Sequence, residues 1–210
     1  MQNTSKIYNL QAFATLPLAG KKIGVLGGSF NPPHAGHLAI CKKALGLGLD
    51  YVLWLVVPQN PLKPPYELPL QKRVELAANL ASIEPHIIVS SLEEETKTTN
   101  TYDTLRYLTS HFPKTDFVWI MGVDCLKEFH LWENYDKFSG LVDIMIFNRK
   151  GYEDLLTNSI AGKVLSAKPC KKYESGIVFV EEKLSDLSST EIRIRNCHPR
   201  EGVDPDNNKN

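Results

Sequence analysis

The chain has 210 residues, and its 24 Lys and Arg balance its 24 Asp and Glu, so the formal net charge is zero. This length fits one α/β domain, and the charge balance argues against a strongly basic nucleic-acid-binding protein while leaving room for a local phosphate pocket. No apolar stretch approaches the roughly 18 residues that a membrane helix needs, so we expect neither a nucleic-acid nor a membrane partner.

The two ends of the chain differ in composition from its middle. Residues 1–20 contain an apolar run that Pro17 interrupts, which favours an N-terminal extension over a signal peptide. Residues 21–196 are predicted to form a single domain, and the polar residues 197–210 a flexible tail. The cysteines show no C-x-x-C pair, which predicts free thiols and a cytoplasmic location; they are Cys41, Cys125, Cys170 and Cys197.

Apolar runs alternate with helix-like patterns along the predicted domain. The strands are expected at Lys22–Gly27, Tyr51–Val57, His86–Ser90, Phe117–Gly122, Val142–Asn148 and Ile177–Glu181. The helices are expected at Gly36–Leu47, Leu70–Ser82, Tyr102–His111, Tyr152–Leu165 and Ser189–Asn196. This alternation predicts an α/β fold with a Rossmann-like, doubly wound, mainly parallel sheet and helices on both faces. Such sheets bind ligands beyond the carboxyl ends of their strands.

A glycine-rich turn with two histidines follows the first predicted strand, at Gly27-Gly28-Ser29-Phe30-Asn31-Pro32-Pro33-His34-Ala35-Gly36-His37. Glycines let the backbone approach a ligand, and a helix N-terminus attracts phosphate. His34 and His37 are three residues apart, so on a first helical turn they share a face and can both donate to phosphate oxygens. A capped helix with two surface histidines is the alternative. Neither a G-x-G-x-x-G nor a Walker A loop is present.

Further motifs follow downstream. Ser188-Ser189-Thr190-Glu191-Ile192-Arg193 combines good N-cap residues with an arginine, which suits either ATP phosphates or a plain capped helix. Gly122-Val123-Asp124 is followed by Trp132, whose flat face suits a heteroaromatic ring but is equally typical of core packing.

Together these motifs resemble those of the H-x-G-H nucleotidyltransferase superfamily, and from about Lys22 to Asn196 the chain looks like the bacterial nicotinate-nucleotide adenylyltransferases. Thr101-Tyr102-Asp103-Thr104-Leu105 is similar to the T-x-D-T-L element of that family, although Asn100 replaces an aromatic residue found in many relatives. Lys63 corresponds to a family lysine, with Leu62 in place of the usual histidine. Arg149 resembles the R-P-G corner, in which Lys150 replaces proline and Gly151 is retained.

The resemblance implies a set of site residues. The residues expected to bind ATP are Gly27, Gly28, Ser29, Phe30, His34, His37, Gly122, Asp124, Ser188, Ser189, Thr190 and Arg193. Those expected to bind the nicotinate nucleotide are Asn31, Lys63, Thr101, Asp103, Trp132 and Arg149. Asp103 has a competing interpretation as a helix cap. Arg73 stands at the family's arginine position, but a solvated surface cation is the favoured interpretation.

The implied reaction is attack of a phosphate monoester oxygen of nicotinate mononucleotide on the α-phosphorus of ATP, giving deamido-NAD and pyrophosphate. Because the second pKa of a phosphate is about 6, the nucleophile is already ionised and needs no strong base. Catalysis is then positioning and charge stabilisation by His37, His34 and Arg193, with Mg²⁺ carried by ATP and no dedicated metal site.

Three alternatives stay open from the sequence. In the first, the acceptor is nicotinamide mononucleotide instead of the nicotinate nucleotide. In the second, the acceptor is phosphopantetheine. In the third, the chain is a nucleotide-binding regulator without catalysis. The sequence also leaves the oligomeric state open, a homo-oligomer included.

Overall fold

The computed structural model describes residues 7–60, 62–98, 100–149, 152, 154–165, 168–169 and 176–181. Over these residues the strands form one parallel sheet in the order β3-β2-β1-β4-β5-β7-β6. The strands are β1 (Lys22–Gly28), β2 (Tyr51–Val56), β3 (Ile87–Ser90), β4 (Asp116–Gly122), β5 (Asp143–Phe147), β6 (Lys168–Pro169) and β7 (Ile177–Val180). The predicted Rossmann-like fold is confirmed, and each predicted strand matches an observed one to within one residue at either end.

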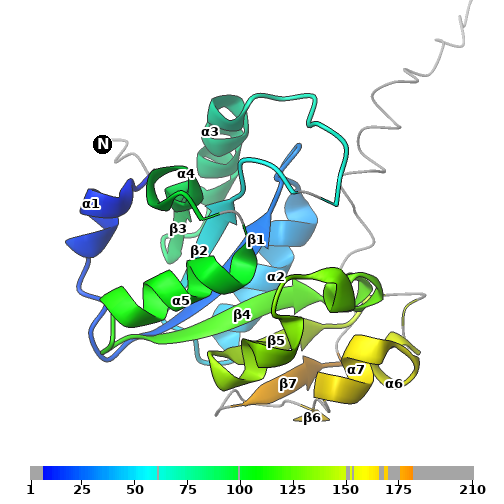
Figure 1. The fold of residues 1–210 in the computed structure, drawn as a ribbon. Coiled ribbons are helices and arrows are strands. Elements are labelled where there is room, and N and C mark those ends of the chain that lie inside the picture. Colours follow the sequence, from blue (N-terminus) through cyan, green and yellow to red (C-terminus); the bar gives the residue numbers. More distant parts are fainter. Residues whose placement is uncertain are drawn as a thin grey trace, which may run out of the picture.

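Helices cover both faces of the sheet (Figure 1). They are α1 (Leu10–Ala14), α2 (Ala35–Gly46), α3 (Leu70–Ala81), α4 (Leu92–Thr96), α5 (Thr101–His111), α6 (Leu155–Asn158) and α7 (Ile160–Leu165). Three short 3-10 helices follow β4: η1 (Val123–Lys127), η2 (Phe129–Leu131) and η3 (Tyr135–Gly140). None of the described helices is long and apolar enough to cross a membrane.

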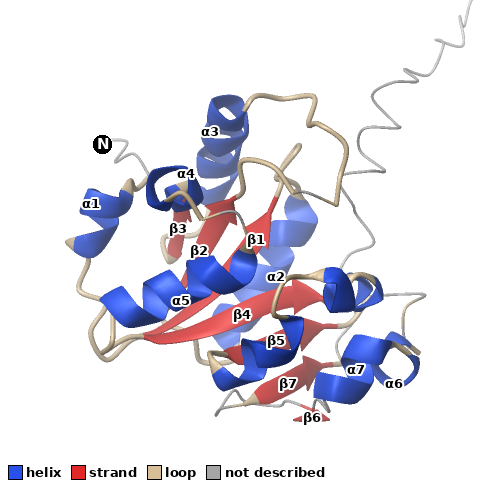
Figure 2. Ribbon diagram, in the orientation of Figure 1, coloured by secondary structure: helices blue, strands red, loops and turns tan. Residues whose placement is uncertain are grey.

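The sheet is buried on both sides, which explains its nearly continuous apolar strands. Along β2, Leu53 and Leu55 point into a core shared with α1, α5 and the 3-10 helices. The intervening Val52, Trp54 and Val56 point into a second core shared with α2 and α3. Figure 2 shows these two helical layers on opposite sides of the strands.

The helix predicted at Tyr152–Leu165 is wrong as a single element. The described part of that segment forms α6 and α7, separated by Ser159 in an extended conformation. The Ser159 hydroxyl oxygen accepts a 2.9 Å hydrogen bond from the Gly162 N–H. Serine competes with helical hydrogen bonding in this way, so it ends one helix and caps the next.

The residues predicted to form an N-terminal extension join the domain where the structure describes them. Phe13 on α1 is completely buried, and Leu18 is nearly so. Upstream, Ile7 forms a parallel bridge with Val89 on β3. The predicted helix at Ser189–Asn196 and the tail lie outside the described residues.

Candidate functional site

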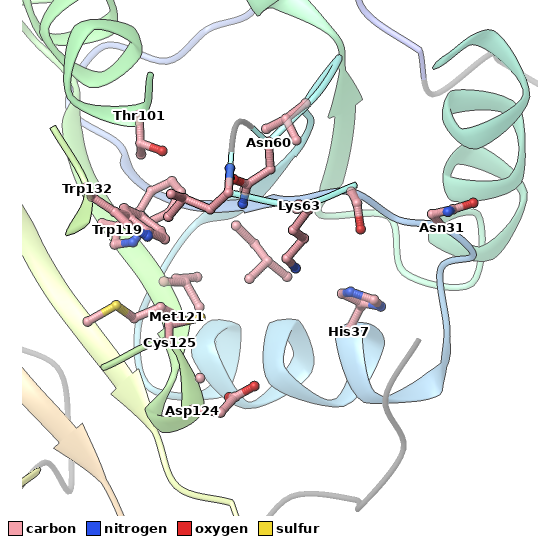
Figure 3. A pocket seen from close by; sticks show the side chains of 18 of the residues that line it. Asn31, His37, Asn60, Lys63, Thr101, Trp119, Met121, Asp124, Cys125 and Trp132 are labelled. Carbon is pink, nitrogen blue, oxygen red and sulfur yellow. The ribbon is translucent and has the colours of Figure 1, made fainter. Parts of the chain in front are cut away.

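A cavity of about 760 Å³ opens beyond the carboxyl ends of β1, β2 and β4. The sheet order changes direction between β1 and β4, and ligand sites of doubly wound folds occur at this switch point. Figure 3 shows His37 toward one end of the cavity and Trp119 with Trp132 at the other, with Lys63 between them in the view. We call these the histidine end (Gly28, Ser29, His34, His37) and the tryptophan end (Thr101, Trp119, Trp132, Phe138).

The structure brings most of the predicted site residues together around this cavity. Those that line it are Gly27, Gly28, Ser29, Asn31, His34, His37, Lys63, Thr101, Gly122, Asp124, Trp132 and Arg149. Phe30 and Asp103 are described but do not line it. Ser188, Ser189, Thr190, Arg193 and the corner at Lys150 and Gly151 lie outside the described residues, so their roles stay predictions.

The two histidines cap the start of α2 reciprocally. His34 Nδ1 accepts a 3.1 Å hydrogen bond from the Gly36 N–H, and His37 Nδ1 accepts a 3.2 Å bond from the His34 N–H. A backbone N–H can only donate, so the proton of each neutral ring lies on Nε2. The helix cap therefore fixes the tautomer and leaves each ring with an Nε2–H donor.

Phe30 supports this arrangement from the protein interior. Its completely buried ring lies 4.7 Å from that of His37 and 5.0 Å from that of Trp54, between centroids. A direct contact of the Phe30 ring with ATP therefore does not fit this geometry. Burial lowers the pKa of His37 well below its ordinary value, and the charges of His34 and Arg149 add to the shift. His37 is consequently neutral near pH 7 and suited to donate from Nε2.

The loop between β2 and α3 presents Lys63 to the cavity. The Gln59 side-chain amide donates to the carbonyl oxygens of Lys63 and Pro64, at 3.0 and 3.2 Å. The Lys63 N–H in turn donates to the Asn60 carbonyl at 3.0 Å. These bonds shape the backbone that carries the ammonium group.

The ends of β4 and β5 supply a charged pair. Arg149 Nη1 donates to Asp124 Oδ2 at 3.0 Å, and both side chains are partly exposed at the cavity wall. A Cβ added at Gly122 would lie 2.3 Å from Asp124 Oδ1, so the carboxylate needs glycine at that position. This contact gives the G-x-D spacing a physical reason.

Aromatic side chains build the tryptophan end. The Trp132 ring lies edge-on to Trp119 at 5.9 Å and contacts Phe129 at 5.1 Å and Phe138 at 6.1 Å, between centroids. Gly27, near the end of β1, lies against this wall, because a Cβ there would meet Trp119 Cη2 at 2.4 Å. Glycine at position 27 therefore lets the end of β1, from which the histidine loop starts, lie close to the tryptophan wall.

The start of α5 forms the remaining wall, and there Asn100 is the helix cap, with Asp103 as its hydrogen-bond partner. Asn100 Oδ1 accepts from the Asp103 N–H at 2.8 Å, and its amide donates to Asp103 Oδ2 at 2.9 Å. Thr104 donates to the buried Glu93 carboxylate at 2.9 Å. Burial raises the pKa of Glu93 to about 7. Part of the T-x-D-T-L element thus holds α5 in place while Thr101 faces the cavity.

Several cavity residues were not predicted. For Trp119 the sequence holds a weak indication of a site residue, because its indole lies near the end of a predicted strand. For Glu93 it holds none, because the run Glu93-Glu94-Glu95 is typical of a solvated surface, whereas Glu93 is buried. Cys125 also lines the cavity, and burial raises the pKa of its thiol to about 12, which makes it a poor nucleophile. Arg73 is 1% exposed, so the expectation of a solvated cation is wrong.

Comparisons with known proteins identify relatives over most of the chain. Residues 25–195 match the family described as Cytidylyltransferase-like. A probable nicotinate-nucleotide adenylyltransferase from Methylorubrum extorquens (strain PA1) is 38% identical over 83% of this chain and 100% of its own length. One from Parvibaculum lavamentivorans is 43% identical over 84% of this chain and 92% of its own length.

A solved structure supports the fold. Nicotinic acid mononucleotide adenylyltransferase of Plasmodium falciparum, complexed with NaAD, superposes with a TM-score of 0.64 at 22% identity, covering 83% of each chain.

Proposed function

This chain belongs to the nicotinate-nucleotide adenylyltransferase family of nucleotidyltransferases, and on that premise we propose that it transfers AMP from ATP to nicotinate mononucleotide. The products are deamido-NAD and pyrophosphate, and the reaction is a step of NAD biosynthesis. The observation that carries this proposal is a single cavity with N–H donors at one end and an indole wall at the other.

The chemistry follows from the fixed tautomers. An oxygen of the acceptor's phosphate attacks the α-phosphorus, and the bond from that phosphorus to the bridging β-phosphate oxygen breaks. We assign the Nε2–H of His37 to the α-phosphate, where negative charge grows, and that of His34 to phosphate binding. Since these donors are already oriented by the helix cap, little reorganisation is needed in the transition state. Neither histidine acts as a base.

The other site residues divide between the two substrates, ATP and the acceptor nucleotide. We propose that Lys63 contacts phosphate as a point charge and that Trp132 stacks on the pyridine ring. Gly27, Gly28 and Ser29 are proposed to bring backbone close to ATP, while Asn31, Thr101 and Arg149 face the acceptor nucleotide. The pyrophosphate contacts of Ser188, Ser189, Thr190 and Arg193 remain predictions from sequence.

We propose that Mg²⁺ arrives with ATP. Among the described residues, no group of three or more His, Cys, Asp or Glu is arranged to hold a metal, and the Asp124 carboxylate at the cavity wall already accepts from Arg149. This donor set fits an ion bound mainly by phosphate oxygens, with Asp124 offering its second oxygen. Such an ion would neutralise phosphate charge when bound. A cytoplasmic location stays a prediction.

Pyrophosphate release tests the assignment directly. The protein is incubated with ATP, Mg²⁺ and one acceptor at a time: nicotinate mononucleotide, nicotinamide mononucleotide or phosphopantetheine. We expect the highest kcat/KM with nicotinate mononucleotide and identify deamido-NAD by mass. Faster release with another acceptor would reassign the substrate, whereas nucleotide binding without release with any of them would favour a regulator.

A further inference from the structure

Arg73 is a buried cation whose hydrogen-bond partners, among the described residues, are main-chain carbonyl oxygens. It lies on the first turn of α3 and is 1% exposed. Nε donates to the Leu68 carbonyl at 3.1 Å, and Nη2 donates to the Pro58 carbonyl at 2.8 Å. Burying a guanidinium is costly unless its donors are satisfied, so this position calls for a specific explanation.

The third nitrogen joins two different loops. Arg73 Nη1 donates to the Val57 carbonyl at 2.8 Å and to the Ser29 carbonyl at 2.7 Å. Ser29 belongs to the loop after β1 that leads to His34 and His37. Val57, Pro58 and Leu68 belong to the loop after β2 that carries Lys63. One planar group therefore ties the histidine loop to the lysine loop.

Tyr66 extends this connection toward the cavity. Its ring centroid lies 4.6 Å from the Arg73 guanidinium carbon. Its hydroxyl oxygen accepts a 3.0 Å hydrogen bond from the Asn60 N–H, and Asn60 in turn accepts from the Lys63 N–H. The path from the guanidinium to the backbone of Lys63 is thus continuous.

Only arginine has the shape for this position. Its fork directs several N–H groups in one plane, and here three nitrogens reach four carbonyls. Lysine keeps the charge, but its single nitrogen cannot reach all four of these carbonyls.

We propose that Arg73 is a positioning residue for the transfer reaction, which fixes the distance between the loop that carries the histidines and the loop that carries Lys63. This inference rests on the proposed function. On the proposed function each loop holds one phosphate, and attack on the α-phosphorus needs both phosphates aligned. A misplacement of about 1 Å can cost roughly 100-fold in rate.

The test compares Arg73→Lys with Val74→Ala, a neighbouring buried position on α3 whose apolar side chain has no polar group to donate to the carbonyls of either loop. Kinetic constants for ATP and nicotinate mononucleotide are measured below the melting temperature of each variant, alongside wild type. Hydrogen exchange is followed over residues 28–34 and 57–69. Tyr66→Phe, which removes the acceptor of the Asn60 N–H, serves as a milder second variant.

We expect Arg73→Lys to lower kcat by about 10-fold or more, with each KM changed less than about threefold, and to speed exchange in both segments. Val74→Ala should lower the melting temperature without this kinetic pattern. If Arg73→Lys does not fold, Tyr66→Phe should still lower kcat several-fold and loosen residues 57–69. Unchanged kcat and exchange in the folded variant, or an equal kcat loss in Val74→Ala, would overturn the inference. Inactive wild type would instead refute the proposed function.

Discussion

The histidine end of the cavity is held by hydrogen bonds to main-chain groups, whereas the tryptophan end is held by aromatic packing. His34 and His37 are oriented by the first turn of α2, and Ser29 is fixed through its carbonyl oxygen. Trp132 is oriented by the rings of Trp119, Phe129 and Phe138. A donor must meet a growing charge with narrow angular tolerance, whereas a stacking face tolerates sliding. Changes at the two ends should therefore affect different kinetic constants.

Replacing His37 with Ala should have the largest effect on the histidine end. Loss of one oriented transition-state donor should lower kcat by roughly 100-fold or more, with a smaller change in either KM. Steady-state kinetics of pyrophosphate release measure this. His86→Ala, at an exposed histidine remote from the cavity lining, is the matched control. Near-wild-type turnover of His37→Ala would refute the assigned role.

At the tryptophan end, Trp132→Ala should act mainly on acceptor binding. Loss of the stacking face should raise KM for nicotinate mononucleotide about tenfold, which corresponds to about 1.4 kcal/mol, with KM for ATP little changed. Trp132→Phe keeps a smaller face and should fall between wild type and Ala. An increase confined to KM for ATP would mean that Trp132 does not face the acceptor.

Gly27→Ala tests the contact between the two ends. The added Cβ would overlap Trp119 Cη2, so the indole must move, at a cost of about 1–3 kcal/mol in the free energy of unfolding. We expect a several-fold higher KM for the acceptor, although the substitution lies in β1 directly before the histidine loop. Gly46→Ala, where an added Cβ meets nothing within 4 Å, is the control. Equal effects of the two substitutions would contradict this coupling.

The last expected effect is on stability, not on a kinetic constant, and lies beside the tryptophan end. The folded state raises the pKa of Glu93 from its ordinary 4.5 to about 7, so between these pH values the folded protein binds the extra proton. The free energy of unfolding should therefore fall as pH rises from 4.5 to 7, by up to about 3 kcal/mol from this group, since one pKa unit corresponds to about 1.4 kcal/mol.

Glu93→Gln imitates the neutral carboxyl and should flatten that pH dependence, as thermal unfolding between pH 5 and pH 8 can show. Glu94→Gln, at an exposed neighbour, should leave it unchanged. The same slope in wild type and Glu93→Gln would show that Glu93 is ionised across this range.

The sequence was sufficient for the parts of the site that depend on local patterns. The strands and most of the helices follow from periodicity, and the placement of His34 and His37 follows from a glycine-rich turn before a helix. Long-range packing decides the rest. Arg73 is buried because carbonyls from two distant loops converge on it, and Glu93 because Thr104 lies eleven residues away on another helix. Composition cannot distinguish such charges from solvated ones.

The short segment before α1 has a consequence for assembly. The Tyr8 N–H donates to the Val89 carbonyl at 2.8 Å, and the Ser90 hydroxyl donates to the Tyr8 carbonyl at 2.6 Å. The chain thereby covers the outer edge of β3 with its own backbone, and open strand edges are the usual templates for sheet-to-sheet association. Two copies of this protein cannot extend a common sheet across that edge unless residues 7 and 8 are first displaced. A version shortened at its N-terminus would expose the edge and gain a route to aggregation.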